Sequence, residues 1–174
     1  FETLARVPGW IDEVLQGSEA TMAAAERYCY IDYCVVASRG YNYATAHEVA
    51  LKLKEMAYII AEPYSSADFQ HGPLALVEHG FPVFAVIPEG RLDGELIPFF
   101  AQLRDKGADL IVTSGNAEAL AMAQTPLPIP AEIPEWASPP VMVVKGQLFA
   151  LGLTLAKGFD PDHPRSIHKV TLTR

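Results

Sequence analysis

The sequence predicts a three-layer α/β fold, in which a doubly wound, mainly parallel sheet is flanked by helices. Two observations predict it. Apolar runs without polar alternation recur along the 174 residues, as in strands that are buried on both faces. Segments of helical period lie between these runs, so strands and helices alternate. Half of the residues are hydrophobic and a fifth are charged, so we expect one core and a single domain over residues 1–174.

The N-terminal third is expected to contain three helices and one strand. Pro8 suits the first turn of a short entry helix, because proline is tolerated where the backbone N–H has no helical partner. Further helices are expected at 18–28 and 45–60. The apolar run 33–37 between them predicts a buried strand, and Glu62-Pro63 is expected to end the third helix.

The rest of the chain continues the alternation after an irregular segment at 63–72. Each helix is expected from its apolar period, and each strand from a short apolar run. The prolines around Leu127 indicate a weaker strand at an edge of the sheet. The expected elements are a short helix at 74–77, a strand at 81–88, a helix at 96–106, a strand at 110–112, a helix at 117–123, the edge strand at 127–130 and a long helix at 139–157.

Composition excludes several classes of protein. A net charge of -8 argues against a nucleic-acid-binding protein, which needs a basic face. Cys29 and Cys34 have neither CxxC spacing nor a histidine-rich partner motif, which favours a reduced, cytoplasmic protein over a disulfide or a zinc site. The apolar run 148–156 is too short to span a bilayer. We therefore expect no membrane segment, no metal and no cofactor.

The segment from Glu48 to His71 carries the groups of most chemical interest. Glu48, Lys52 and Glu55 are spaced four and three residues apart, so on a helix they stack on one face within reach of one another. His71 follows sixteen residues after Glu55. A carboxylate, an amine and an imidazole could together move protons on a sugar carbonyl. A solvated helix face would show the same stripe, and a histidine before Gly72-Pro73 could also serve as a turn residue.

Three motifs carry a family resemblance: ALKLKE at 50–55, AEPYSSADFQHGPLAL at 61–76 and DPDHPRSIHKVTLT at 160–173. In this order and spacing they resemble the second sugar isomerase (SIS) domain of the glucosamine-6-phosphate synthase isomerase module and of its glutaminase-free relatives. The turn SRGYNYATA at 38–46, the phrase AEPYSSADF and the ending HKVTLTR are more similar to the two-SIS-domain proteins described as glucosamine-6-phosphate deaminases. The resemblance implies chemistry on an amino-sugar phosphate.

The resemblance also implies three catalytic residues. Glu55 matches the glutamate that moves the proton between sugar C1 and C2, and His71 matches the histidine associated with ring opening. Lys169 matches the C-terminal lysine that meets the open-chain carbonyl. Pattern alone would leave this lysine as a solvated residue of the tail, so its role rests on the resemblance.

A second set of residues is expected to bind substrate. Lys52 and Glu48 match charged residues that line the same pocket in the family. We add His168, next to the catalytic lysine, and the small-residue turn Ser38-Arg39-Gly40, whose backbone N–H groups could hold an anion. The turn Thr113-Ser114-Gly115-Asn116 is an alternative anion site of the same kind.

The expected phosphate loop departs from the family pattern. Relatives hold the phosphate on a loop of the type SxSGxT in the first SIS domain, whereas the equivalent turn at 87–93 has two acids and no hydroxyl cluster. We therefore expect the chain to be the C-terminal half of a two-SIS-domain protein, whose N-terminal SIS domain binds the sugar phosphate. The resemblance also implies a homodimer, in which His71 serves the Glu55 of the neighbouring chain. The tail at 158–174 is expected to be an ordered arm, and the alternative is a disordered terminus.

Two other functions remain open at this point. One is the isomerase part of a glutamine-dependent glucosamine-6-phosphate synthase, which would need a glutaminase domain. The other is a regulatory SIS module that binds a sugar phosphate without turnover. A regulator needs donors for a phosphate but no base for C–H chemistry, so the presence of Glu55, His71 and Lys169 together favours an enzyme.

Overall fold

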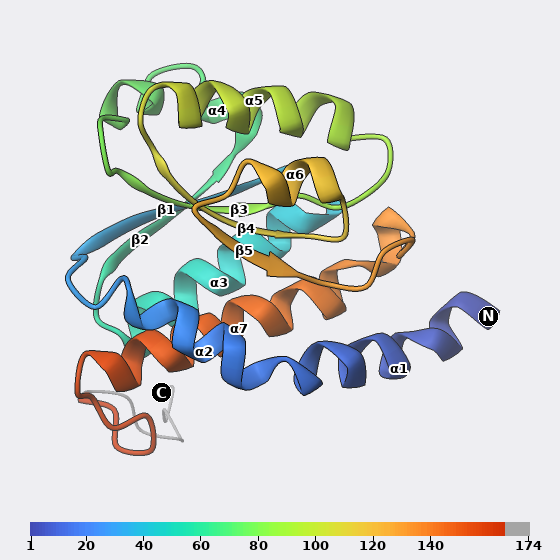
Figure 1. Ribbon diagram of the computed structural model, residues 1–174, viewed down its shortest axis with the longest axis horizontal. Helices are drawn as coiled ribbons and strands as arrows, with labels where there is room; N and C mark the ends of the chain where they lie inside the picture. The colour runs from blue at the N-terminus through green and yellow to red at the C-terminus, as the bar shows by residue number, and fades with distance from the viewer. Residues whose placement is uncertain (166–174) are drawn as a thin grey trace, which may run out of the picture.

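The computed structural model describes residues 1–165 and places five strands in one parallel sheet, in the order β2-β1-β3-β4-β5 (Figure 1). Every neighbouring pair of strands is parallel. The strands are β1 (Tyr33–Ser38), β2 (Ile60–Ser65), β3 (Pro82–Val86), β4 (Asp109–Ser114) and β5 (Thr125–Pro128). The predicted parallel α/β fold is confirmed.

Helices cover both faces of the sheet (Figure 1). One layer contains α1 (Glu2–Gln16), α2 (Ser18–Glu26), α3 (Tyr43–Met56) and α7 (Pro139–Ala156). The opposite layer contains α4 (Ser66–Phe69), α5 (Asp93–Asp105) and α6 (Ala117–Ala121). Three short 3-10 turns complete the described chain: η1 (Gly40–Asn42), η2 (Pro73–Leu76) and η3 (Glu135–Ala137).

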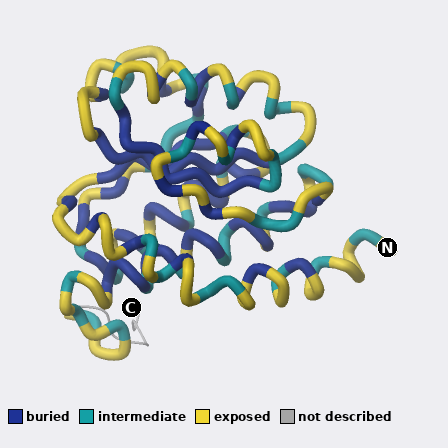
Figure 2. The backbone as a smooth tube through the Cα atoms, in the orientation of Figure 1, coloured by how far each residue is buried: buried dark blue, intermediate teal, exposed yellow. Residues whose placement is uncertain are grey.

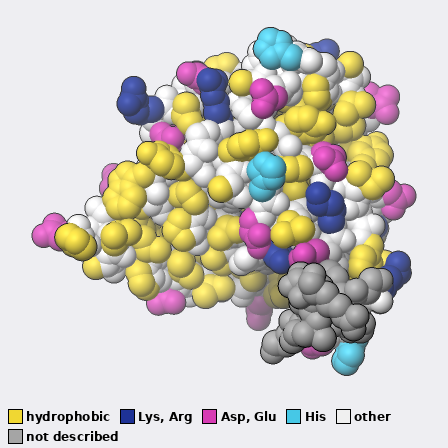
Figure 3. Space-filling view, turned by 180° about the vertical axis from the view of Figure 1, so that it is seen from behind, with side chains coloured by type: hydrophobic (Ala, Val, Ile, Leu, Met, Phe, Trp, Pro, Cys, Tyr) yellow, Lys and Arg dark blue, Asp and Glu magenta, His cyan; other side chains and the backbone are white. Residues whose placement is uncertain are grey.

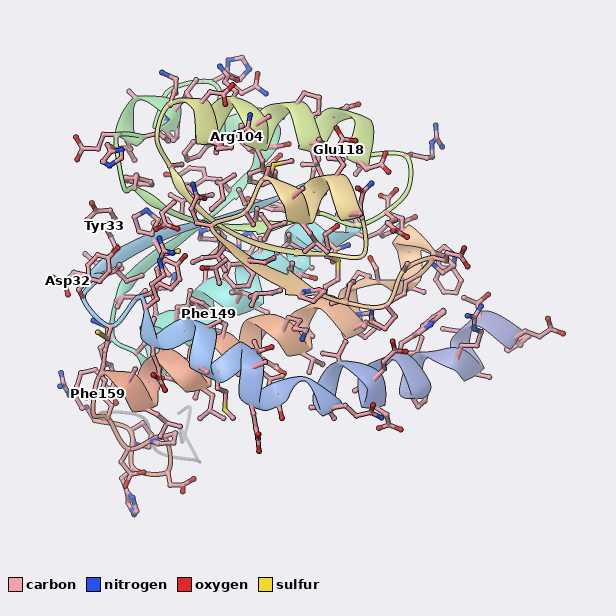
Figure 4. The ribbon with its side chains drawn as sticks, viewed as in Figure 1. Asp32, Tyr33, Arg104, Glu118, Phe149 and Phe159 are labelled. Carbon is pink, nitrogen blue, oxygen red and sulfur yellow. The ribbon has the colours of Figure 1, made fainter. Side chains whose placement is uncertain are left out.

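The core consists of two main apolar clusters, one on each side of the sheet, and Figure 2 shows the central strands buried along their length. Strand β3 contributes to both clusters, because Phe84 and Val86 point to the layer of α3 and α7, whereas Val83 and Ala85 point to the layer of α5. Phe149 of α7, labelled in Figure 4, is fully buried in the first cluster. Burial on both faces explains why these strands lack polar alternation.

Helix α7 is long and apolar enough to span a membrane by length and composition alone, but half of that 18-residue window is buried inside the domain. It packs against α1, α2 and α3. Two glycines allow this close packing, since a Cβ at Gly146 would meet Val49 and one at Gly152 would meet the backbone of Met22. We therefore interpret α7 as a core helix.

The third helix and the segment after it were predicted wrongly. The helix expected to run to Ile60 ends at Met56, and the segment expected to be irregular contains strand β2 at the edge of the sheet. Tyr58 takes a left-handed backbone conformation, with φ of 55°, which stops the helix. Pro63 is compatible with β2 because an edge strand needs fewer ladder hydrogen bonds than a central strand.

The entry helix was also placed wrongly. Helix α1 begins at Glu2, so Pro8 lies within it rather than in its first turn. Pro8 is exposed, and the helix accommodates it without ending. The apolar side chains Trp10 and Val14 face the core, as their spacing predicted.

Candidate active site

The charged stripe on α3 forms as its spacing predicts. Lys52 Nζ lies 2.7 Å from Glu55 Oε2 and 3.7 Å from Glu48 Oε1. About a third of each of these side chains is exposed, so the group lies at the surface without being fully solvated. The opposite side of the helix, with Val49 and Leu53, is fully buried. Core packing therefore fixes the rotation of α3 and turns the three charges outward.

The carboxylates keep the Lys52 ammonium charged. The pKa of Lys52 is raised, first by its hydrogen bond to Glu55 and then by the charges of Glu55 and Glu48, while partial burial acts in the opposite direction. A positive charge at this position holds the Glu55 carboxylate in one orientation. The pair therefore presents a carboxylate oxygen that is already positioned beside a cation.

The turn Ser38-Arg39-Gly40 lies far from this stripe. Helix α3 starts near the carboxyl end of β1 and runs back along the sheet, so Glu55 is twelve residues, or about 18 Å of helix, beyond Tyr43. Ser38 is buried and donates to the carbonyl of Val86 at 2.7 Å. Arg39 pairs with Glu95. The structure thus places this turn and Glu55 at opposite edges of the sheet.

At the carboxyl ends of the strands, where this fold class binds ligands, acidic side chains of the chain itself accept the backbone hydrogen bonds. In the strand order observed here, the crevice lies between the carboxyl ends of β1 and β3. There the backbone N–H of Arg91 donates to Glu135 at 3.1 Å, and that of Gly90 donates to Asp93 at 3.4 Å. These N–H groups would have to leave carboxylates before they could bind a phosphate.

The turn after β4, which is the alternative anion site, also has its hydrogen-bond donors paired within the chain. The Asn116 side chain accepts from the backbone N–H groups of Glu118 and Ala119, which are the first free donors of α6. Ser114 donates to the carbonyl of Ile87 at 2.7 Å. Nearby, the N–H of Glu132 donates to Glu89 at 2.6 Å. The described turns at this edge therefore leave few donors for an anionic ligand.

His71 lies in the other layer of the domain. It follows α4, whose Phe69 is buried in the cluster on the α5 side of the sheet, whereas α3 packs on the opposite side. His71 is exposed, and its backbone N–H donates to the backbone carbonyl of Asp68 at 3.1 Å. Within one chain the sheet separates His71 from Glu55, so the structure does not bring these two side chains together.

Two expected site residues, His168 and Lys169, lie outside the described residues. The part of the arm at 158–165 is described, and it contacts the end of α3. Arg165 stacks on Tyr58 and Phe159, with its guanidinium carbon 4.5 Å from each ring centre. Sequence reasoning missed this contact, because nothing in the local pattern links residues more than a hundred positions apart.

In the view from behind, hydrophobic side chains gather on the side toward which α1 projects (Figure 3). Leu4 and Leu15 of α1 and Leu51 of α3 are among the large apolar residues that remain exposed. Leu51 is four residues before Glu55, so one exposed apolar side chain adjoins the charged stripe. Among residues 1–165 no group of three or more His, Cys, Asp or Glu side chains could hold a metal ion.

Residues 33–157 match the SIS domain family. A glutamine–fructose-6-phosphate aminotransferase (isomerizing) from Thermococcus kodakarensis is 36% identical over 168 residues, covering 97% of this chain and 28% of that protein. The corresponding protein of Leifsonia xyli is 36% identical over 169 residues, covering 94% of the chain and 27% of the relative. The chain thus spans just over a quarter of the length of these curated relatives.

Solved structures of this fold are similar over most of the chain. The C-terminal domain of glucosamine-fructose-6-phosphate aminotransferase from Francisella tularensis superposes with a TM-score of 0.83 at 27% identity, covering 93% of this chain and 46% of that one. A glucosamine-6-phosphate deaminase from Thermotoga maritima gives a TM-score of 0.65 at 23% identity, covering 90% and 47%. At that identity the second similarity shows the fold alone. In both cases the similar chain is about twice as long.

Proposed function

Because the chain belongs to the SIS domain family, we propose that it is a catalytic domain of an enzyme that isomerises or deaminates an amino-sugar phosphate. The observation that carries the proposal is the hydrogen-bonded pair of Lys52 and Glu55 on the outer face of α3. A domain that only bound a sugar phosphate would have no need of a positioned carboxylate there. The 36% identity to an isomerizing aminotransferase over nearly the whole chain supports the same chemistry.

Glu55 is the base in this proposal. Once the sugar ring opens, its carboxylate takes the proton from C2 of the amino aldose and returns it to C1, through an enolamine. The resulting C2 imine reacts with water, so glucosamine 6-phosphate and water give fructose 6-phosphate and ammonia. Lys52 holds the carboxylate through its hydrogen bond to Glu55, and Glu48 and Lys52 would line the substrate pocket. The reaction needs no cofactor and no metal.

His71 and Lys169 complete the proposed site from elsewhere. His71 is on the opposite side of the sheet from α3, so it would assist ring opening at the Glu55 of a neighbouring subunit in a homodimer. Lys169 would meet the open-chain carbonyl, with His168 beside it in contact with substrate. In this arrangement one active site draws on two chains.

The phosphate would be held by an N-terminal SIS domain of the same protein. The chain spans about half of the similar C-terminal aminotransferase structure and a quarter of the curated relatives, which leaves room for such a domain. Glu135 and Asp93 already occupy backbone donors at the carboxyl edge of this domain, which supports a phosphate site outside it. The exposed Leu51, one helical turn before Glu55, would contact that partner domain. We propose a cytoplasmic enzyme.

The isomerase part of a glutamine-dependent synthase is the second candidate. It is favoured by the names of the curated relatives, which are isomerizing aminotransferases that use glutamine and fructose 6-phosphate. The two candidates share the proton transfer and differ in the direction of reaction and the nitrogen source. Ammonia release from glucosamine 6-phosphate favours the deaminase, and glutamine-dependent formation of that sugar favours the synthase.

The test uses the full-length protein that contains this chain. Glu55→Gln should lower kcat by at least about a hundredfold, in whichever direction the wild type runs, while substrate binding measured by calorimetry changes little. Glu118→Gln, in the opposite helix layer, is the control (Figure 4). Wild-type turnover by Glu55→Gln would show that the base is another residue. Absence of turnover in the wild type with either nitrogen source would refute the proposed enzyme.

A further inference from the structure

A cavity of about 620 Å³ opens at the carboxyl ends of the strands, beside the turns that follow β1 and β3. Figure 1 shows the segment before α7, drawn in orange, at the end toward which the β5 arrow points. Cavities that hold small ligands have volumes of roughly 300–1,000 Å³. We call this cavity the aromatic crevice, and its lining includes Tyr41, Arg91, Glu95, Glu135 and Trp136. No step of the proposed reaction uses it.

Two exposed aromatic side chains border the aromatic crevice. Tyr41 belongs to η1 and is 62% exposed, and Trp136 belongs to η3 and is 48% exposed. Beneath them, the buried Asn42 side chain donates to the Ser138 hydroxyl at 2.7 Å, which ties the two turns together. The two rings are therefore held on one framework, and each offers an apolar face to a ligand.

A carboxylate of the chain itself fills the place that an anion would take in this crevice. The backbone N–H of Arg91 donates to Glu135 at 3.1 Å. Gly90 has a φ of 140°, and a Cβ at this position would lie 2.9 Å from Glu135 Oε2. The carboxylate thus packs directly against the backbone of the turn after β3. It would repel a phosphate placed on the same donors.

The charges around the crevice favour a cation. Its lining carries two carboxylates and one guanidinium, that of Arg91. One of the carboxylates, Glu95, pairs with Arg39. Asp93 and Glu89 add two more carboxylates, which accept backbone N–H groups of neighbouring turns. Carboxylate oxygens accept hydrogen bonds from ammonium and hydroxyl groups, and a tryptophan ring attracts a cation to its face.

We propose that the aromatic crevice binds an amino sugar that carries no phosphate. The ammonium group lies beside the carboxylates of Glu95 and Glu135, and the apolar C–H face of the sugar ring packs on Trp136. The guanidinium of Arg91 donates to a ring hydroxyl. This site is at the opposite edge of the sheet from Glu55, so it is separate from the proposed catalytic centre.

The experiment follows Trp136 in the full-length protein, labelled with 5-fluorotryptophan. The fluorine NMR signal of Trp136 is assigned by its absence from Trp136→Leu. Four compounds are titrated at about pH 6.5, where the amines are protonated: glucosamine, N-acetylglucosamine, cyclohexylamine and inorganic phosphate. N-acetylglucosamine keeps the ring without the charge, and cyclohexylamine keeps the charge without the hydroxyl groups. The signal reports on this crevice alone, so binding near Glu55 does not confuse it.

Glucosamine should shift the Trp136 signal with a Kd on the order of 1 mM, as expected for so small a ligand. N-acetylglucosamine and cyclohexylamine should bind at least about tenfold more weakly, and phosphate should cause no shift. Glu135→Gln and Glu95→Gln should each raise the Kd for glucosamine about tenfold, because each removes a charged acceptor. Glu118→Gln, in α6 and outside the lining, is the control and should leave the Kd unchanged.

An unmoved Trp136 signal at about ten times that concentration of glucosamine would overturn the proposal. Equal affinity for N-acetylglucosamine or cyclohexylamine, or a shift caused by phosphate, would also overturn it. Should Glu135→Gln unfold, Glu95→Gln still decides, since that side chain is 56% exposed. Turnover of the amino-sugar phosphate without a Trp136 shift refutes this site alone, whereas a shift without turnover refutes the proposed function alone.

Discussion

Lys52 donates a hydrogen bond to Glu55 at 2.7 Å, one helical turn apart on the outer face of α3. With about 30% of each side chain exposed, this pair should add less than about 1 kcal/mol to the free energy of unfolding. Its value for the protein would therefore lie in orienting the carboxylate rather than in stability. That division of roles can be tested.

Lys52→Met should lower kcat at least about tenfold, because the Glu55 carboxylate loses the donor that fixes its direction. The midpoint of thermal unfolding should move by no more than a few degrees. Lys54→Met, at an exposed position two residues along the same helix, is the control for the loss of a lysine. Equal activity of Lys52→Met and the wild type would mean that this ion pair on the helix surface has no role in the reaction.

The charged stripe was predictable because it is local. Spacings of three and four residues place side chains on one face of any helix, and the buried Val49 and Leu53 decide which face turns outward. The central strands were predictable for a similar reason, since burial on both faces leaves a continuous apolar run such as that of β3.

The missed strand explains why the position of His71 could not be predicted. With β2 in place, the chain reaches the carboxyl edge of the sheet at Ser65 and returns to β3 across the opposite face. Strand β2 was not recognised because Glu62 and Pro63 interrupt its pattern, as an edge strand allows. The end of α3 depends on Tyr58, whose partners Phe159 and Arg165 are distant in sequence.

The close contact between α2 and α7 gives a test of the packing. A Cβ at Gly152 would lie 2.5 Å from the carbonyl oxygen of Met22, so Gly152→Ala should push the two helices apart. We expect a loss of about 2 kcal/mol in the free energy of unfolding, despite the better helix propensity of alanine. Gly9→Ala, in an exposed part of α1 with open space around it, should instead gain up to about 1 kcal/mol. Urea unfolding of the two variants measures both. If Gly152→Ala also raised the free energy of unfolding, helix propensity rather than packing against Met22 would decide its stability.

The arm carries an ion pair that depends on pH. His163 Nδ1 lies 2.8 Å from Asp160 Oδ2. Their hydrogen bond is the main cause that raises the pKa of His163 and lowers the pKa of Asp160. The histidine contribution is present below its ordinary pKa of about 6.5 and is lost as pH rises through the raised value. The aspartate contribution is present above about pH 3.9 and is lost as pH falls through the lowered value. The pair is therefore complete between about pH 4 and 6.5.

An NMR titration of the His163 imidazole checks this pair. Asp160→Asn should return the pKa of His163 to its ordinary range, and added salt should reduce the shift in the wild type because both groups are exposed. An unchanged His163 titration in Asp160→Asn would show that the two side chains do not pair in solution.

Lys145 offers the sharpest test of stability against pH, because it is buried in α7 with 4% of its surface exposed. Burial lowers the pKa of its ammonium. Its Nζ donates to the Thr21 hydroxyl at 3.1 Å, and that hydroxyl itself donates to the carbonyl of Gly17. Replacing the lysine therefore leaves Thr21 with a hydrogen bond.

Proton binding by Lys145 sets the direction in which the free energy of unfolding changes with pH. Between the lowered pKa in the folded protein and about 10.4 in the unfolded chain, the unfolded state binds more protons, so the Lys145 contribution to the free energy of unfolding rises with pH. Lys145→Met removes this dependence. At pH 7 we expect the variant to be as stable as the wild type or more stable, by up to about 2 kcal/mol, with the difference narrowing toward pH 10.

Other groups that titrate at high pH, such as Tyr28 with its raised pKa, are common to both proteins and cancel in the comparison. Urea midpoints from pH 7 to 10 measure the difference, with the exposed Lys106→Met as control. A difference that stays constant over this range would mean that Lys145 titrates like an exposed lysine.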